Sequence, residues 1–266
     1  MRILLTNDDG ITAPGIVALA KRLQQDGHQI IVAAPESERS GAGHSFTLHS
    51  PLSVTKPILG VYGDMEIYAI SGTPVDCVLL ATAELVKEPL DLVLSGINAG
   101  SNIGTDVVYS GTVNAALEGC ICGVPSISLS QFFGRQQREI DLDSFKNAAE
   151  LTAQIIKSID ISALCGFIYN INFPAVQPCD LKGIKVCGQG VNDSETIYEK
   201  LVTPSGKDVY WISSKEKAVE DDSLRETDVK WLKEGYITVT PLAWNGTLES
   251  AIDDTKCKMA NIELHL

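Results

Sequence analysis

The sequence lacks any run of about 18 consecutive apolar residues, which is the length that a membrane-spanning helix needs. Its first apolar run, in MRILLTNDDG, is interrupted by acids within nine residues, which is not typical of a secretory signal peptide. These two absences argue against a membrane protein and against a secreted one. We therefore expect a cytoplasmic protein without a targeting segment.

Basic residues are scarce as well. The chain carries 21 lysines and arginines against 34 acidic residues, which gives a net charge of −13 at pH 7. A field of that sign repels the phosphate backbone of DNA and RNA. A nucleic-acid polymer is therefore not an expected partner, although a small anion can still bind beside a metal ion.

Several common catalytic motifs are absent. The sequence contains no G-x-S-x-G nucleophile motif, no G-x-x-x-x-G-K-[ST] phosphate loop and, among four histidines, no H-E-x-x-H zinc motif. Its seven cysteines are scattered, and no second pair complements Cys120 and Cys122. We expect reduced cysteines and no zinc site, and we expect His44 to be a partly exposed loop residue without a catalytic role.

The pattern of apolar residues indicates an α/β fold. Runs at residues 3–5, 30–32 and 92–94 show no polar alternation, which is typical of parallel strands covered on both faces. The segment between the first two runs has apolar residues at helical spacing and predicts an amphipathic helix. The same alternation continues downstream, with helices expected over 73–88, 110–123 and 143–158 and strands over 124–130 and 166–174. We predict a doubly wound, mostly parallel Rossmann-like sheet.

Two regions depart from this alternation. Residues 46–54 and 65–70 predict short antiparallel strands. From about residue 176 the chain contains short strand patterns, separated by polar stretches such as SSKEKAVEDDS at 213–223, which we expect to be a solvated loop. We therefore predict a catalytic core at 1–175 and a strand-rich C-terminal lobe or arm at 176–266 that serves oligomerisation.

Polar side chains follow three of the predicted strands. Asp8 and Asp9 come after the first strand, Ser40 after the second, and Asn98 after the strand at 91–96. Ligands of doubly wound sheets bind at the carboxyl ends of strands. Two carboxylates about 4 Å apart repel by roughly 1 to 4 kcal/mol, and a divalent cation removes that repulsion. The all-oxygen set favours Mg²⁺, Mn²⁺ or Ca²⁺ over zinc.

Two local features bear on this site. We expect Gly10 to end the first strand, so that both acids can face one cation. Ser110, Gly111 and Thr112 begin a predicted helix, where free N–H groups and the helix dipole can bind phosphate. Taken alone, these residues favour capping of the helix over phosphate binding.

The motifs together resemble the survival protein E (SurE) family of metal-dependent nucleoside monophosphate phosphatases. The matching segments occur in order, whereas residues 243–266 carry no resemblance; the segments are NDDGITAPGI, APESERSGAGHSFTL, GTPVDCVLLA, DLVLSGINAGSNIG, DVVYSGTVNAALEG, GVPSISLS, NINFP and TDVKWLKEGYITVTPL. The resemblance implies one Mg²⁺ or Mn²⁺ per subunit, and it implies a homodimer or tetramer, with exchange of C-terminal segments in some relatives.

The resemblance also implies residue roles. The metal ligands would be Asp8, Asp9, Ser40 and Asn98, and the phosphate would bind Asn102, Ser110, Gly111 and Thr112. The implied reaction is hydrolysis of nucleoside 5′-monophosphates by a metal-bound water, with side activity on 3′-nucleotides and polyphosphate. Asp8 and Asp9 are the catalytic candidates, and we expect Asp9 to orient or deprotonate the water.

Other functions remain as alternatives. A Mg²⁺-binding receiver-type signalling domain without phosphatase activity also places paired acids after its first strand, but it needs an aspartate at the end of a central strand. Here Asp91 begins that strand. A dinucleotide-dependent oxidoreductase is disfavoured because the sequence has no G-x-G-x-x-G fingerprint. A covalent route through Ser110 is disfavoured because no adjacent base is visible.

Overall fold

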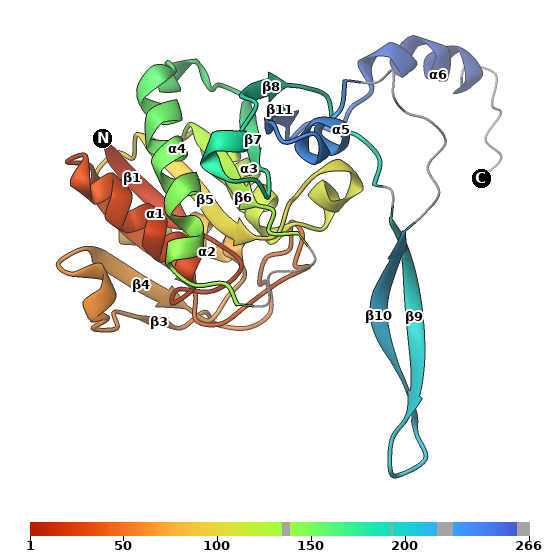
Figure 1. Ribbon diagram of the computed structural model, residues 1–266, viewed down its shortest axis with the longest axis horizontal. Helices are drawn as coiled ribbons and strands as arrows, with labels where there is room; N and C mark the ends of the chain where they lie inside the picture. Colours follow the sequence, from red (N-terminus) through yellow and green to blue (C-terminus); the bar gives the residue numbers. More distant parts are fainter. Residues whose placement is uncertain (135–138, 193, 217–225, 260–266) are drawn as a thin grey trace, which may run out of the picture.

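The computed structural model describes residues 1–134, 139–192, 194–216 and 226–259, and a nine-stranded sheet forms its centre (Figure 1). Across the sheet the strands lie in the order β3 (Val54–Thr55), β4 (Glu66–Ile70), β2 (Gln29–Pro35), β1 (Arg2–Thr6), β5 (Leu92–Ala99), β6 (Ser126–Gln131), β7 (Phe167–Phe173), β11 (Ile237–Ala243) and β8 (Ile184–Val186). Only the β3–β4 and β7–β11 pairs are antiparallel; the other pairs of this sheet are parallel. The predicted α/β class and mostly parallel sheet are confirmed.

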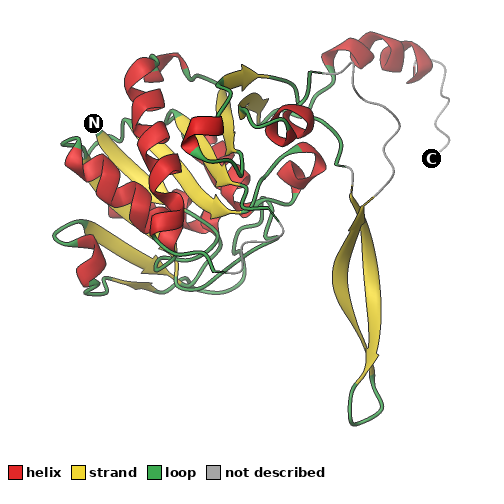
Figure 2. Ribbon diagram, viewed as in Figure 1, coloured by secondary structure: helices red, strands yellow, loops and turns green. Residues whose placement is uncertain are grey.

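Helices cover both faces of the sheet (Figure 2). Helices α1 (Pro14–Gln25) and α4 (Lys146–Ser158) pack on one face, and α2 (Pro74–Leu80) and α3 (Gly111–Ile121) pack on the other. Within β1, Ile3 and Leu5 belong to the core under α1 while Leu4 belongs to the core under α2, because successive side chains of a strand face opposite ways. Burial on both faces explains why the central strands lack polar alternation.

Helix α2 begins where the sequence predicts. The Thr73 hydroxyl accepts the Asp76 N–H at 3.1 Å, and the Asp76 carboxylate accepts the Thr73 N–H at 2.8 Å. This reciprocal pair is a capping box, which satisfies two N–H groups that the first helical turn leaves without partners. The helix continues as a π-helical turn over Ala81–Leu85.

The C-terminal part has two structural roles. Strands β11 and β8 extend the central sheet, whereas β9 (Ser194–Val202) and β10 (Asp208–Glu216) form a separate antiparallel hairpin that projects from the body (Figure 1). Short helices α5 (Asp228–Lys233) and α6 (Ile252–Met259) complete this part. No helix within the described ranges is both long and apolar enough to cross a membrane.

Three details of the predicted elements differ from the structure. The antiparallel strand expected over 46–54 is reduced to β3 because residues 46–53 form loop and bend. Strand β9 was not predicted, since SETIYEKLV contains no continuous apolar run. The loop expected at 213–223 is wrong at its start, because residues 213–216 belong to β10; residues 217–223 lie outside the described residues.

Candidate active site

The paired acids lie in a turn that directly follows β1. The strand ends at Thr6, so both acids follow it as predicted, although Gly10 is not the residue at which it ends. The Asn7 amide closes the turn: its nitrogen donates to the Gly10 carbonyl at 2.9 Å, and its oxygen accepts the Gly10 N–H at 3.2 Å. Gly10 has a φ of 97°, a conformation that glycine adopts most easily. Because the chain turns at Asn7, the side chains of Asp8 and Asp9 do not have to point to opposite faces as they would in a continuing strand.

Most of the predicted site residues line one cleft of about 440 Å³ at the carboxyl ends of β1, β2 and β5. The predicted members of this lining are Asp8, Asp9, Ser40, Asn98, Asn102 and Ser110. Sequence reasoning missed the other lining residues, which are Glu38, Gly41, Ala99, Ser101, Asp106 and Tyr109. Glu38 lies two positions before Ser40 in the same loop, so its proximity to the predicted ligand was a usable signal.

Asp8 is held from behind by the start of α3. Its carboxylate accepts the Thr112 hydroxyl at 2.6 Å and the Thr112 N–H at 3.2 Å, and its side chain is buried. Gly111 makes this approach possible, because a Cβ atom there would lie 2.8 Å from Cβ of Asp8. Gly111 and Thr112 thus contact Asp8 and are not among the residues that line the cleft.

Asp9 is half-buried and is held by β5. Its carboxylate accepts the N–H of Ala99 at 3.1 Å. Burial and the neighbouring Asp8 charge raise the pKa of Asp9 to about 6. Burial also raises the pKa of Asp8, even though the hydrogen bonds from Thr112 oppose that rise. Both carboxylates are therefore destabilised as anions in the absence of a nearby positive charge.

The two neutral predicted ligands have oxygen atoms available. The Asn98 amide nitrogen donates to the Gly100 carbonyl at 2.8 Å, and its amide oxygen accepts no hydrogen bond from a described residue. The Ser40 hydroxyl donates to Glu38 at 2.8 Å and keeps its lone pairs. Asn98 and Ser40 can each supply a neutral oxygen ligand.

The charge of the cleft matches a cation. Four carboxylates line it (Asp8, Asp9, Glu38 and Asp106), and no described lining residue is lysine or arginine. Among the described residues, no group of three or more histidine, cysteine or acidic side chains has the arrangement of a metal site, so neutral oxygens must complete any set. Carboxylate and neutral oxygens are the donors that hard divalent cations prefer, so the residues present fit such an ion.

Ser110 begins α3 and caps it. Its hydroxyl oxygen accepts the Val113 N–H at 3.0 Å, so the capping role favoured by these residues alone is present. The same hydroxyl lines the cleft and still carries a proton that it can donate. Capping and phosphate binding are therefore compatible at this residue.

Comparison with known proteins gives the family. Residues 3–196 match the family model described as survival protein SurE. The chain belongs to the SurE family. It is 43% identical to a 5′-nucleotidase SurE of Natranaerobius thermophilus over 93% of this chain and 94% of that protein. It is 42% identical to a 5′-nucleotidase SurE of Lawsonia intracellularis over 100% of this chain and 99% of that protein.

A solved SurE structure supports the same assignment. The crystal structure of a SurE protein from Aquifex aeolicus superimposes with a TM-score of 0.77 at 36% identity, covering 97% of this chain and 99% of that chain. The similarity therefore extends beyond the segment that the family model matches and includes the C-terminal part of the chain. The SurE fold is thus common to both proteins.

A buried amide network lies beneath the SurE cleft and was missed by sequence reasoning. The Asn102 N–H donates to the Asn172 side chain at 2.8 Å, and the Asn102 carbonyl accepts from Asn170 at 2.8 Å and from Asn172 at 3.2 Å. The Asn102 side chain donates to Ser130 at 2.8 Å. The sequence NINF could have indicated this network, because its two asparagines alternate with apolar residues and so lie on one face of β7.

His44 contacts a buried acid of the same SurE core. Its ring nitrogen lies 2.7 Å from a carboxylate oxygen of Glu118 on α3. The loop that carries Ser40 is thereby attached to the helix that positions Asp8. His44 is an exposed loop residue, and it is not among the residues that line the cleft.

Proposed function

We propose that this protein is a divalent-cation-dependent 5′-nucleotidase that hydrolyses nucleoside 5′-monophosphates to nucleoside and phosphate. The observation that carries the proposal is the cleft with four carboxylates and no lysine or arginine among its described lining residues. A phosphate ester carries negative charge at neutral pH and would be repelled there, unless a cation binds between it and the acids. The names of the two relatives identify the same activity.

Asp8, Asp9, Ser40 and Asn98 would hold the cation. Mg²⁺ and Mn²⁺ are the ions we propose, because every donor is an oxygen. When bound, the ion supplies positive charge opposite the phosphoryl group and makes a nearby water more acidic. Asp8 is fixed by Thr112 at 2.6 Å and is proposed as the ligand with least freedom to move.

The remaining roles belong to side chains around the phosphate. Asp9 is proposed to orient the attacking water and accept its proton, since its half-buried carboxylate lines the cleft beside Asp8. Asn102 and the Ser110 hydroxyl would donate hydrogen bonds to phosphate oxygens, with the Gly111 N–H at the helix start. Thr112 donates both its hydroxyl and its N–H to Asp8, so it would affect phosphate binding indirectly, by positioning Asp8.

We further propose side activity on 3′-nucleotides and polyphosphate, because the cleft is open to solvent and its neutral donors recognise phosphate alone. A cytoplasmic location is part of the proposal and is consistent with seven unpaired cysteines. The division into a catalytic core at 1–175 and an arm at 176–266 is proposed as a functional division, since β11 and β8 belong to the main sheet.

A homodimer or tetramer with exchanged C-terminal segments is also proposed. Its support is the β9–β10 hairpin, which projects from the body and exposes large apolar side chains (Figure 1). These exposed residues are Tyr198, Leu201, Val202, Val209, Tyr210, Trp211 and Ile212. Exposed apolar patches of this kind mark surfaces that another chain can cover. Sedimentation of the full chain tests the proposal, and a monomer at micromolar concentration would contradict it.

The central experiment measures phosphate released from AMP and GMP with Mg²⁺ or Mn²⁺, before and after chelation. We expect chelator to abolish the release and Asp9→Asn to lower kcat by about 10² or more. Asp64→Asn is the matched control, because Asp64 is exposed and distant from the cleft lining. Full activity in chelator would refute the proposal, and a stable aspartyl phosphate without turnover would favour the signalling alternative.

A further inference from the structure

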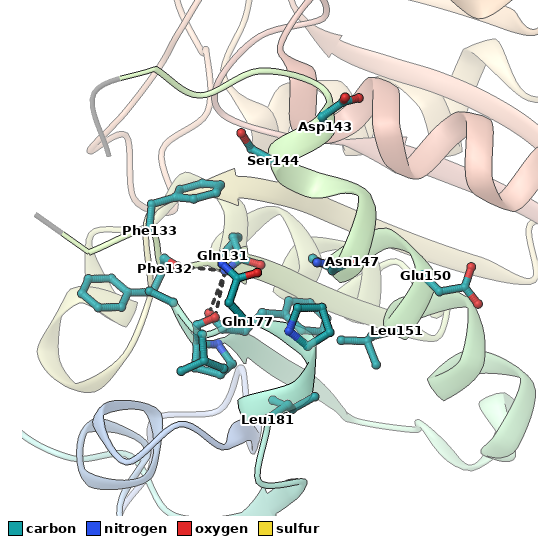
Figure 3. A pocket seen from close by; sticks show the side chains of 16 residues that line it. Gln131, Phe132, Phe133, Asp143, Ser144, Asn147, Glu150, Leu151, Gln177 and Leu181 are labelled. Carbon is teal, nitrogen blue, oxygen red and sulfur yellow. Dashed lines mark hydrogen bonds between the residues drawn. The ribbon is translucent and has the colours of Figure 1, made fainter. Parts of the chain in front are cut away.

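A second cavity, shown in Figure 3, shares no lining residue with the candidate active site. Its volume is about 460 Å³, and it lies between the carboxyl ends of β6 and β7 and the start of α4. This volume falls within the range typical of small-molecule sites. The proposed reaction leaves the cavity without a role.

Gln131, the last residue of β6, presents an oriented acceptor to this cavity. Its side-chain nitrogen donates to three carbonyls, those of Phe132 at 2.8 Å, Pro174 at 3.1 Å and Phe173 at 3.4 Å. Carbonyl oxygens only accept hydrogen bonds, so the nitrogen must face them and the amide oxygen must face the cavity.

That amide oxygen has no partner among the described residues. The Gln131 side chain is only 9% exposed, and Figure 3 shows its oxygen on the cavity side, facing Asn147. This oxygen is not among the fully buried side-chain atoms without a partner, so water in the cavity can donate to it in the free protein. A ligand that donates a hydrogen bond at this point would replace that water.

The walls of the cavity select a neutral flat ligand. Phe133, Phe173 and Pro174 supply ring surfaces, and Phe133 is held edge-on against Phe145 with centroids 5.1 Å apart. No described lining residue is lysine or arginine, while Asp143 and Glu150 contribute carboxylates at its edge. The described lining therefore favours an uncharged ring that bears an amino group over a phosphate group.

We propose that this cavity binds the base of a nucleoside through an exocyclic amino group that donates to the Gln131 amide oxygen, with the exposed amide of Asn147 as a second partner. Nucleosides are the products of the proposed nucleotidase, so the choice of a nucleoside as the ligand rests on the proposed function. That an amino-bearing ring binds in this cavity rests on the cavity residues alone. The site is connected to the active site, because the Gly100 N–H donates to the Gln131 carbonyl at 2.9 Å.

Calorimetry on the chelated full-length protein tests the proposal without turnover. Adenosine should bind, and purine riboside, which differs only by loss of the amino group, should bind about three- to tenfold more weakly, since one net hydrogen bond contributes about 0.5 to 1.5 kcal/mol. Leu151→Trp fills the cavity and should weaken adenosine binding at least tenfold. Leu79→Trp is the matched control, because Leu79 is a half-buried leucine of α2 on the opposite face of the sheet.

Further variants separate the two sites. Asn147→Ala alters an exposed residue, so it should fold normally and weaken adenosine binding two- to tenfold. Asn98→Ala alters the cleft and should leave adenosine binding unchanged. The proposal is overturned if wild type does not bind adenosine, if purine riboside binds equally well, or if only the cleft variant weakens binding. Failure of AMP hydrolysis would refute the proposed nucleotidase while leaving adenosine binding intact, so the two failures are distinguishable.

Discussion

Replacing Asp9 by asparagine should make the cation-free protein more stable at neutral pH. In the folded chain the pKa of Asp9 is raised from 3.8 to about 6, first by burial and then by the charge of Asp8. Between these two values the folded state binds more protons than the unfolded state, so its stability falls as pH rises. A difference of about 2 pKa units corresponds to roughly 3 kcal/mol, lost as pH rises from about 4 to about 6.

Asparagine removes this charge and keeps an oxygen that can accept the Ala99 N–H. In chelator, denaturant unfolding from pH 4 to 7.5 should therefore show that the advantage of Asp9→Asn over wild type grows with pH and levels off above pH 6. At pH 7 the difference should be on the order of 2 to 3 kcal/mol. The comparison with wild type measures Asp9 together with its repulsion from Asp8, because the charge of each carboxylate disfavours the charge of the other.

Addition of Mn²⁺ should reverse the order of stability. An ion that binds only the folded state contributes about 4.1 kcal/mol at one thousand times its Kd, which exceeds the advantage of the variant, and the variant lacks one of the proposed ligands. Asp64→Asn serves as the control and should respond to pH and to Mn²⁺ as wild type does. The reasoning is refuted if the cation-free variant is no more stable than wild type at pH 7, or if Mn²⁺ stabilises both proteins equally.

Three other predictions concern residues around the cleft and the core. Thr112→Val removes the hydroxyl that donates to Asp8 and should weaken Mn²⁺ affinity about tenfold in a thermal titration, whereas Thr112→Ser should restore it. Asn172→Leu breaks the hold on Asn102 and should lower kcat about tenfold or more in the phosphate-release assay, with Mn²⁺ affinity unchanged. Asp76→Asn should cost about 1 to 3 kcal/mol at pH 7, because hydrogen bonds outweigh burial and lower the pKa of Asp76; denaturation should show this cost disappearing as pH falls below about 4.

The strands and helices of the core were largely predictable because their signals are local. The apolar runs of β1, β2 and β5 and the helical spacing of α1 each lie within a dozen residues. The Thr73 cap needs only its own neighbours. The hairpin strand β9 was missed because charged residues interrupt its apolar ones, whereas its equally exposed partner β10 was predicted from the continuous run VYWI.

The candidate site was predictable as a set of residues and not as a set of contacts. Polar residues at strand ends indicated Asp8, Asp9, Ser40 and Asn98, because parallel strands bring their carboxyl ends to one edge. The sequence could not show that Thr112 donates to Asp8, since the two residues are 104 positions apart. The sequence indicated Gly10 as the residue that ends β1, whereas in the structure the side chain of Asn7 closes the turn together with Gly10.

The sequence alone determined which elements form and which strand ends carry oxygen ligands, because burial pattern and turn chemistry are properties of neighbouring residues. The tertiary structure decided how these ends meet. It decided that a carboxylate pair would lie in a cleft without lysine or arginine among its described lining residues, and that Asn170 and Asn172 would hold Asn102 from below. Hydrogen bonds and pKa shifts depend on distances across the sheet, and only the folded chain sets those distances.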